Sequence, residues 1–145
     1  MSPVYKIPVS VLVVIHTPDL QVLLLERADH PGYWQSVTGS QDPGENLRDT
    51  AIREVKEETG LNAQAYELSD CGEINTYEIY PEWRHRYAPG VTHNTEHVWR
   101  LKLPETRPIS LAVREHLNYA WYPYREAAQK CFSPSNAQAI LRLAT

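Results

Sequence analysis

The sequence predicts an α/β domain in which a mixed β-sheet lies between helices. Residues 9–15 are a nearly unbroken β-branched run, which is typical of a central strand covered on both faces. Residues 46–59 repeat apolar side chains with the period of an amphipathic helix. Strands mixed with two or three helices are characteristic of the α/β class. The 145 residues suffice for one core of normal size, so we expect a single domain over residues 1–145.

Two strand-like segments follow the first run. A Thr-Pro-Asp turn leads into residues 21–26, and these are expected to form a hairpin with the first strand. Residues 34–38 form a short strand that ends at Gly39. An Asp-Pro-Gly turn then directs the chain into the clearest helix of the sequence.

The helix predicted over residues 46–59 has recognisable ends. Asn46 is a favoured N-cap residue, and Gly60 stands where a left-handed C-terminal residue is wanted. Its apolar stripe repeats every four residues and comprises Leu47, Ala51, Val55 and Thr59.

The signals beyond this helix are weaker. They predict strands at residues 77–80, 96–103 and 117–122, and helices at residues 125–130 and 135–143. Residues 81–95 carry two prolines and a glycine and are predicted to form a long loop, of a length that is usually functional or mobile.

Composition excludes several classes of protein. The formal net charge is −4, so a nucleic-acid surface is not expected. No apolar run approaches the ~20 residues that cross a bilayer, and no secretory leader is evident, so no membrane partner is expected. Cys71 and Cys131 form no CxxC pair and are interpreted as reduced thiols of a cytoplasmic protein.

Three carboxylates crowd one part of the predicted helix. Glu54, Glu57 and Glu58 stand at i, i+3 and i+4, where each like-charged pair costs ~0.2–0.5 kcal/mol. They also lie toward the helix C-terminus, where each acid is disfavoured by ~0.3–1 kcal/mol. Glu58 falls inside the apolar stripe and is therefore expected to point into the domain.

A solvated acidic face is the ordinary interpretation of such a cluster, but it leaves a buried carboxylate without a cation. Neither Arg53 nor Lys56 is placed to neutralise Glu58. A divalent cation would turn the repulsion into chelation, and hard oxygen ligands favour Mg²⁺, with Mn²⁺ as an alternative. Because Mg²⁺ shares substrate phosphates, a phosphate ester or anhydride is the expected ligand.

The segment that contains this helix resembles the motif of a known family. Gly39, Glu45 and the run from Arg53 to Leu61 match the Nudix box, residues 39–61, at every defined position. The chain is therefore similar to Nudix hydrolases. The resemblance implies a Nudix-type α/β/α sandwich and Mg²⁺-dependent attack of water on a diphosphate linked to another moiety.

The resemblance also implies roles for residues of the box. Glu54, Glu57 and Glu58 match the family's metal-binding glutamates, and Arg53 matches the arginine that orients a glutamate. Outside the box, matching stretches occur at residues 5–6, 8–10, 34–40, 84–92, 94–96 and 115–117. Through them the chain is similar to one branch, the bacterial dihydroneopterin triphosphate diphosphatases of folate synthesis. In that branch a distant glutamate completes the metal site, and Glu115 matches it. The general base is either Glu57 or Glu115, which the sequence does not decide.

The substrate of that branch is a pterin triphosphate, and candidate contacts to it come from several segments. Lys6 and Arg27 would meet phosphates, Thr38 would offer a hydroxyl, and residues 77–80 would line a ring pocket. The candidates are Lys6, Arg27, Thr38, Tyr77, Glu78, Ile79, Tyr80 and Ser133. Glu78 is expected to accept a hydrogen bond from a pterin amino group. The basic stretch 84–86 either approaches the triphosphate or is a solvated loop or subunit contact.

Three alternatives remain at this point. The first keeps the chemistry and makes the protein a general nucleoside or deoxynucleoside triphosphate pyrophosphohydrolase. The second is a module that binds a nucleotide or pterin without hydrolysis, and the third is an acidic scaffold with no ligand. The intact box opposes a pure binding module, because such a module has no need for Glu57 and Glu58 against helix repulsion. The oligomeric state is left open.

Overall fold

The computed structural model describes residues 4–145, and its central strand is β1 (Val9–His16). β1 pairs in parallel with β6 (His93–Lys102) and antiparallel with β4 (Val37–Ser40). Every residue of β1 from Ser10 onward is buried, so the prediction of a strand covered on both faces is confirmed.

The remaining strands extend this sheet on both sides. The strand order is β3-β2-β1-β6-β5, with β4 paired to β1 and β7 paired to β2. The bounds are β2 Gln21–Arg27, β3 Trp34–Gln35, β5 Glu67–Glu78 and β7 His116–Pro123. The expected hairpin between β1 and β2 exists, but it is short. Only His16 and Val22 pair across it, because β2 pairs along its length with β7.

Three sequence predictions differ from the structure. Residues 34–38 form two strands rather than one, since the chain leaves β2 at β3 and pairs with β1 as β4. Of the strand expected at residues 77–80, only Tyr77 and Glu78 are strand, and they end the 12-residue β5. Most of β5 is exposed, and its sequence has no clear apolar alternation that would have predicted it. The loop expected at residues 81–95 contains the 3₁₀-helix Pro81–Arg86 and the start of β6.

The predicted helices are all present. In α1 (Leu47–Thr59) the Asn46 side chain accepts a hydrogen bond from the Asp49 N–H at 2.8 Å, and Gly60 ends the helix with φ of 79°. α2 covers Tyr124–Lys130 and α3 covers Pro134–Leu141, with short 3₁₀ turns at Ala63–Ala65 and Arg142–Ala144.

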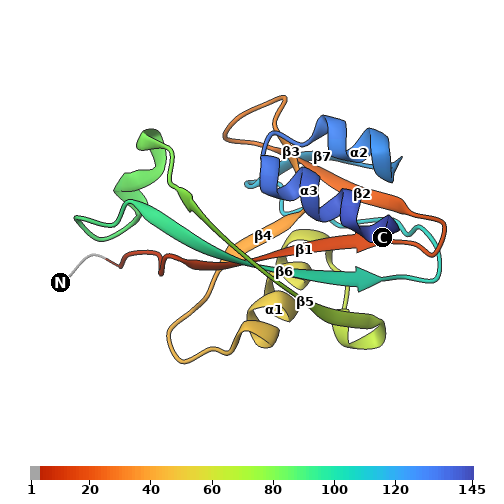
Figure 1. Ribbon diagram of the computed structural model, residues 1–145, viewed down its shortest axis with the longest axis horizontal. Coiled ribbons are helices and arrows are strands. Elements are labelled where there is room, and N and C mark those ends of the chain that lie inside the picture. The colour runs from red at the N-terminus through yellow and green to blue at the C-terminus, as the bar shows by residue number, and fades with distance from the viewer. Residues whose placement is uncertain (1–3) are drawn as a thin grey trace.

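The helices form two layers around the sheet. α1 lies on one face, and α2 and α3 lie on the other (Figure 1). Alternate residues of β1 supply both cores: Val11, Val13 and Ile15 face α1, whereas Leu12 and Val14 face α2 and α3. This is the α/β architecture that the sequence predicts. No helix within residues 4–145 combines the length and apolarity needed to cross a membrane.

Candidate active site

The side chain of Glu54 on α1 packs directly against the backbone of Gly39 on β4. At Gly39, a Cβ atom would lie 2.0 Å from the Cδ atom of Glu54. Only a residue without a side chain leaves room for this carboxylate against the strand. The glycine of the box therefore positions the first glutamate of the cluster.

Substituting this glycine tests the approach. Gly39→Ala should force the Glu54 carboxylate away from β4 and lower the free energy of unfolding by about 1–3 kcal/mol, the usual range for overpacking. Chemical denaturation measures the stability, and titration with Mn²⁺ measures binding. The control Ser69→Ala, on exposed β5, should leave both quantities unchanged. Normal stability and Mn²⁺ affinity in Gly39→Ala would contradict this account.

The three box glutamates lie in different environments. The exposed fraction is 1% for Glu58 and 9% for Glu54, whereas the Glu57 side chain is 52% exposed. The prediction that Glu58 points into the domain is confirmed. Neither oxygen of Glu58 has a hydrogen-bond partner among the described residues. Burial, together with the nearby Glu54 carboxyl, raises the pKa of Glu58 well above its ordinary value.

Arg53 binds the carboxylates of Glu45, Glu54 and Glu57. Its Nε lies 2.8 Å from Glu45 Oε2, and its Nη1 donates to Glu54 Oε1 at 2.7 Å. A further hydrogen bond reaches the Ser40 carbonyl at 2.9 Å, and a longer contact reaches Glu57 at 3.4 Å. The hydrogen bonds from Arg53 lower the pKa of Glu45 to about 2. Arg53 thus fixes Glu54, whereas Glu58 has no hydrogen bond from it and its Oε1 lies 3.6 Å from His116 Nε2.

Glu115 reaches this cluster from a distant part of the chain. It directly precedes β7, and its carbonyl accepts a hydrogen bond from the Ala28 N–H at 2.8 Å. Potential ligand atoms of Glu58, Glu115 and His116 all lie within 4.8 Å of one another. Burial lowers the pKa of His116 to about 4, so this ring is neutral at pH 7. His116 is not among the metal ligands expected from the sequence.

The donor set at this point fits a divalent cation. Glu58 and Glu115 offer carboxylate oxygens beside the neutral His116 ring, and the Glu54 carboxyl lies next to Glu58. Within residues 4–145 the Glu58 oxygens are buried without a hydrogen-bond partner. Buried carboxylates in native proteins are paired or coordinate metals, and oxygen ligands suit hard cations. The residues present therefore suit the ion that the sequence predicts.

A cluster of cations lies across the same cleft. Arg27 donates to both Asp29 oxygens at 2.7 Å and to Gln35 at 3.0 Å. Arg86 also reaches Asp29, at 3.3 Å, and the Lys6 N–H donates to the Arg86 carbonyl at 2.9 Å. Burial and the nearby Arg86 lower the pKa of Lys6. Two arginines share Asp29, so this side of the cleft keeps a positive charge.

Aromatic rings support these cations. The Arg27 guanidinium lies 4.6 Å from the centroid of the Trp83 ring, and Trp83 meets Phe132 edge to face at 6.3 Å. The basic stretch 84–86 is thereby packed beside the cleft through the 3₁₀-helix that carries it. Of its three residues, Arg86 lines the cleft, whereas Arg84 pairs with Glu78 at 2.6 Å.

The cleft has a volume of about 1070 Å³, and every site residue predicted from the sequence lines it. These residues are Lys6, Arg27, Thr38, Arg53, Glu54, Glu57, Glu58, Tyr77, Glu78, Ile79, Tyr80, Glu115 and Ser133. The structure thus brings all of them into one cavity, whereas their roles in binding or catalysis stay predictions.

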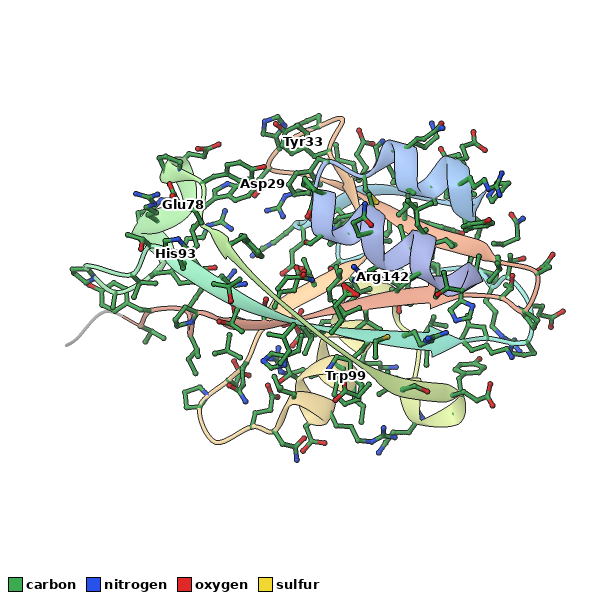
Figure 2. The ribbon with its side chains drawn as sticks, in the orientation of Figure 1. Asp29, Tyr33, Glu78, His93, Trp99 and Arg142 are labelled. Atoms are coloured by element: carbon green, nitrogen blue, oxygen red, sulfur yellow. The ribbon has the colours of Figure 1, made fainter. Side chains whose placement is uncertain are left out.

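Several predicted substrate contacts have local partners. The Thr38 hydroxyl donates to the Val11 carbonyl at 3.0 Å, so only its lone pairs face a ligand. Ser133 caps α3 and lies 3.0 Å from the Ser135 hydroxyl. The Glu78 side chain is 65% exposed and lies at the outer end of β5 (Figure 2).

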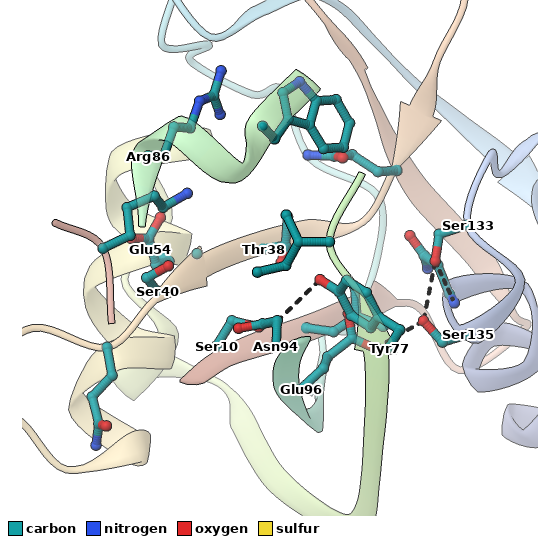
Figure 3. Close-up of a pocket in the computed structure, with 18 of the residues that line it drawn as sticks. Ser10, Thr38, Ser40, Glu54, Tyr77, Arg86, Asn94, Glu96, Ser133 and Ser135 are labelled. Carbon is teal, nitrogen blue, oxygen red and sulfur yellow. Dashed lines mark hydrogen bonds between the residues drawn. The ribbon is translucent and has the colours of Figure 1, made fainter. Parts of the chain in front are cut away.

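The sequence missed polar residues at the floor of the cleft. Ser10, Asn94 and Glu96 are buried there, and Glu96 lies beside the first residues of α3 (Figure 3). They come from β1 and β6, where Ser10 and Glu96 are register partners. Only their occurrence as polar residues inside otherwise apolar strands could have indicated them.

Comparisons with known proteins agree with this architecture. A family model described as NUDIX domain matches residues 6–143. The chain is 49% identical to the dihydroneopterin triphosphate diphosphatase of Escherichia coli, over 94% of this chain and 92% of that protein. It is 43% identical to the enzyme of the same name from Haemophilus influenzae, over 94% and 87%.

A solved structure gives the same result in three dimensions. The structure of the E. coli dihydroneopterin triphosphate pyrophosphohydrolase superposes with a TM-score of 0.90 at 48% identity, covering 97% of each chain. With the box glutamates gathered at one cleft and a family match along nearly the whole chain, this protein belongs to the Nudix family.

Proposed function

We propose that this protein is a Mg²⁺-dependent pyrophosphohydrolase that converts 7,8-dihydroneopterin triphosphate to the monophosphate and pyrophosphate, a step of folate biosynthesis. The observation that carries the proposal is the 49% identity to a dihydroneopterin triphosphate diphosphatase over 94% of the chain. The cleft supports it, because one cavity joins a carboxylate cluster to a cation cluster and a polar floor. We further propose one domain over residues 1–145, acting in the cytoplasm on small molecules.

The chemistry requires neutralisation of phosphoryl charge and activation of water. Glu54, Glu58 and Glu115 are proposed to hold the cation, which when bound offsets charge on the phosphoryl oxygens. Arg53 is proposed to act through Glu54, whose carboxylate it orients. Glu57 and Glu115 are the two candidates for the general base, since both line the cleft beside Glu58.

The remaining residues are proposed to bind the substrate. Lys6 and Arg27 would contact the triphosphate, with Arg86 added to them on the geometry of the cation cluster. Thr38, Ser133 and residues 77–80 would surround the rest of the molecule. A charge-assisted hydrogen bond to phosphate is about twice as strong as a neutral one, so these cations would dominate affinity.

A product-resolved substrate screen tests the proposal. Purified protein is assayed with Mg²⁺ against dihydroneopterin triphosphate and the four common deoxynucleoside triphosphates at equal concentrations. We expect the pterin to have the highest kcat/KM and to yield pyrophosphate. A preference for deoxynucleotides would support the general pyrophosphohydrolase instead, and binding without pyrophosphate release would support a binding module.

The role of Arg53 gives a second test. Arg53→Lys keeps the charge but removes the planar fork that bonds Glu45 and Glu54 together. We expect a 10–100-fold loss of activity, about the usual effect of removing a residue that orients metal ligands, with a weaker apparent affinity for Mg²⁺. The matched control is Arg48→Lys on the same helix, whose side chain donates to the Leu68 carbonyl at 3.4 Å and lies away from the box carboxylates. Equal activities of the two variants would contradict the positioning role.

A further inference from the structure

Glu96 is a buried acid that the proposed reaction leaves without a role. It lies on β6 opposite Ser10, its exposed fraction is 4%, and it lines the cleft. The Ser135 hydroxyl donates to Glu96 Oε1 at 2.9 Å, and Ser133 lies 3.0 Å from Ser135 (Figure 3). The first residues of α3 therefore fix the orientation of this carboxylate.

No cation of the described residues compensates Glu96. The ion pairs of the structure involve other acids, including Glu73, which pairs with Arg142. Burial raises the pKa of Glu96, and the nearby Ser135 hydroxyl and Asn75 amide lower it in part. A carboxylate has about four acceptor positions, and this hydroxyl occupies one. Burying such a group without further donors costs stability, so a donor-rich ligand is the natural complement.

Neighbouring amides show the same lack of partners. Asn94 uses its Nδ2 to donate to Ser10 at 2.8 Å and to the Tyr77 hydroxyl at 3.1 Å. These bonds fix the amide, and its buried Oδ1 is left without a partner among the described residues. The Nδ2 of Asn75 is likewise buried and unpartnered. Buried polar atoms are normally satisfied, so this part of the cleft wall is incomplete without a polar ligand.

We propose that Glu96 recognises the substrate ring by accepting hydrogen bonds from an N–H and the adjacent amino group of a 2-amino-4-oxopyrimidine, the unit that pterins and guanine share. The proposal rests on the proposed function and names the group that selects the ring. Two adjacent donors match the two oxygens of a carboxylate, as in bidentate pairing with arginine. An adenine ring presents an acceptor beside its amino group and would place a lone pair against the carboxylate.

This assignment replaces Glu78, the residue expected from the sequence to accept a hydrogen bond from the pterin amino group. Glu78 is exposed at the rim, and Arg84 already occupies its carboxylate at 2.6 Å. Discrimination between rings is largest where a mismatched group is left buried and unpaired, a condition that Glu96 meets and Glu78 does not.

The test compares Glu96→Gln with wild type on three substrates: dihydroneopterin triphosphate, dGTP and dATP. Glutamine offers one acceptor and one donor, which pairs poorly with the pterin and guanine edge but suits adenine. We expect kcat/KM for dihydroneopterin triphosphate and dGTP to fall about 10–100-fold, while that for dATP is unchanged or rises. Glu105→Gln, an exposed acid away from the cleft, is the matched control.

Two further measurements keep the outcomes distinct. Thermal melting confirms that Glu96→Gln is folded, and if it is not, Glu96→Asp replaces it and should lose the same two substrates. Equal losses on dGTP and dATP, or loss of discrimination in Glu78→Gln instead, would overturn the assignment while the proposed function stands. If wild type prefers dGTP to dihydroneopterin triphosphate and this preference over dATP depends on Glu96, the assignment stands and the pterin function fails.

Discussion

Glu58→Gln should abolish hydrolysis and at the same time stabilise the metal-free protein. The activity should fall by about 10³-fold or more, because electrostatic stabilisation by a bound cation is worth several kcal/mol in the transition state. The free energy of unfolding in EDTA should rise by about 1–3 kcal/mol at pH 7.5, since the variant removes a buried carboxylate whose oxygens have no partner. Opposite effects on activity and stability are the signature of a residue retained for function.

The pH dependence of stability follows from the same residue. The pKa of Glu58 is raised by burial, so above the ordinary value of 4.5 the unfolded chain releases a proton that the folded chain retains. Stability of the metal-free wild type should therefore decrease as pH rises from that value, and Glu58→Gln should flatten this decrease. Denaturant titrations over about pH 5–8 in EDTA measure both slopes.

Two comparisons make this result specific. The control Glu67→Gln removes an exposed acid of β5 and should change neither activity nor the slope. Saturating Mg²⁺ should stabilise the wild type but not Glu58→Gln, because an ion that binds only the folded state adds stability that grows with the logarithm of its concentration over Kd. A Glu58→Gln variant that is less stable than wild type in EDTA would show that the buried charge is not a source of strain.

The box helix could be predicted in detail because its determinants are local. Asn46, its bonding partner Asp49 and the terminal Gly60 lie within one or two turns of the helix ends. The burial of Glu58 followed from its place in the apolar stripe. Such short-range rules do not depend on the rest of the fold.

The parts that were missed depend on contacts between distant segments. β5 is an exposed edge strand defined by pairing with β6, as in the Glu67–Lys102 pair, and its own sequence has little alternation. Glu115 was placed at the metal site by resemblance rather than by pattern, since only the pairing of β2 with β7 brings it there. Glu96 escaped notice because one polar residue in a strand does not reveal which cavity it faces.

The cation cluster was predicted only in part for the same reason. Lys6 and Arg27 were expected to meet phosphates, but the convergence of Arg27 and Arg86 on Asp29 depends on the packing of Trp83. The sequence left the stretch 84–86 undecided between a phosphate contact and a solvated loop. The structure places Arg86 in the cleft and turns Arg84 toward Glu78.

Arg27→Ala should weaken binding of the triphosphate more than it alters any other property. Asp29 and Gln35 hold the Arg27 guanidinium in one orientation, so little side-chain entropy remains to be lost when phosphate binds. Each charge-assisted hydrogen bond contributes about 1.5–3 kcal/mol, so kcat/KM should fall by about 10–150-fold, mainly through KM. Inhibition by inorganic pyrophosphate, which lacks any ring, should weaken by a similar factor.

The matched control is Arg125→Ala on α2, whose exposed side chain contacts only its neighbour Tyr124. Raising the salt concentration should weaken binding to wild type more steeply than to Arg27→Ala, because one cation fewer is screened. The two variants separate the roles within the cleft: Arg27→Ala should weaken the binding of pyrophosphate and substrate alike, whereas Glu96→Gln should leave pyrophosphate inhibition unchanged. If Arg27→Ala instead spares pyrophosphate and changes only the preference among rings, Arg27 belongs to the ring pocket and the triphosphate must be bound chiefly by Lys6 and Arg86.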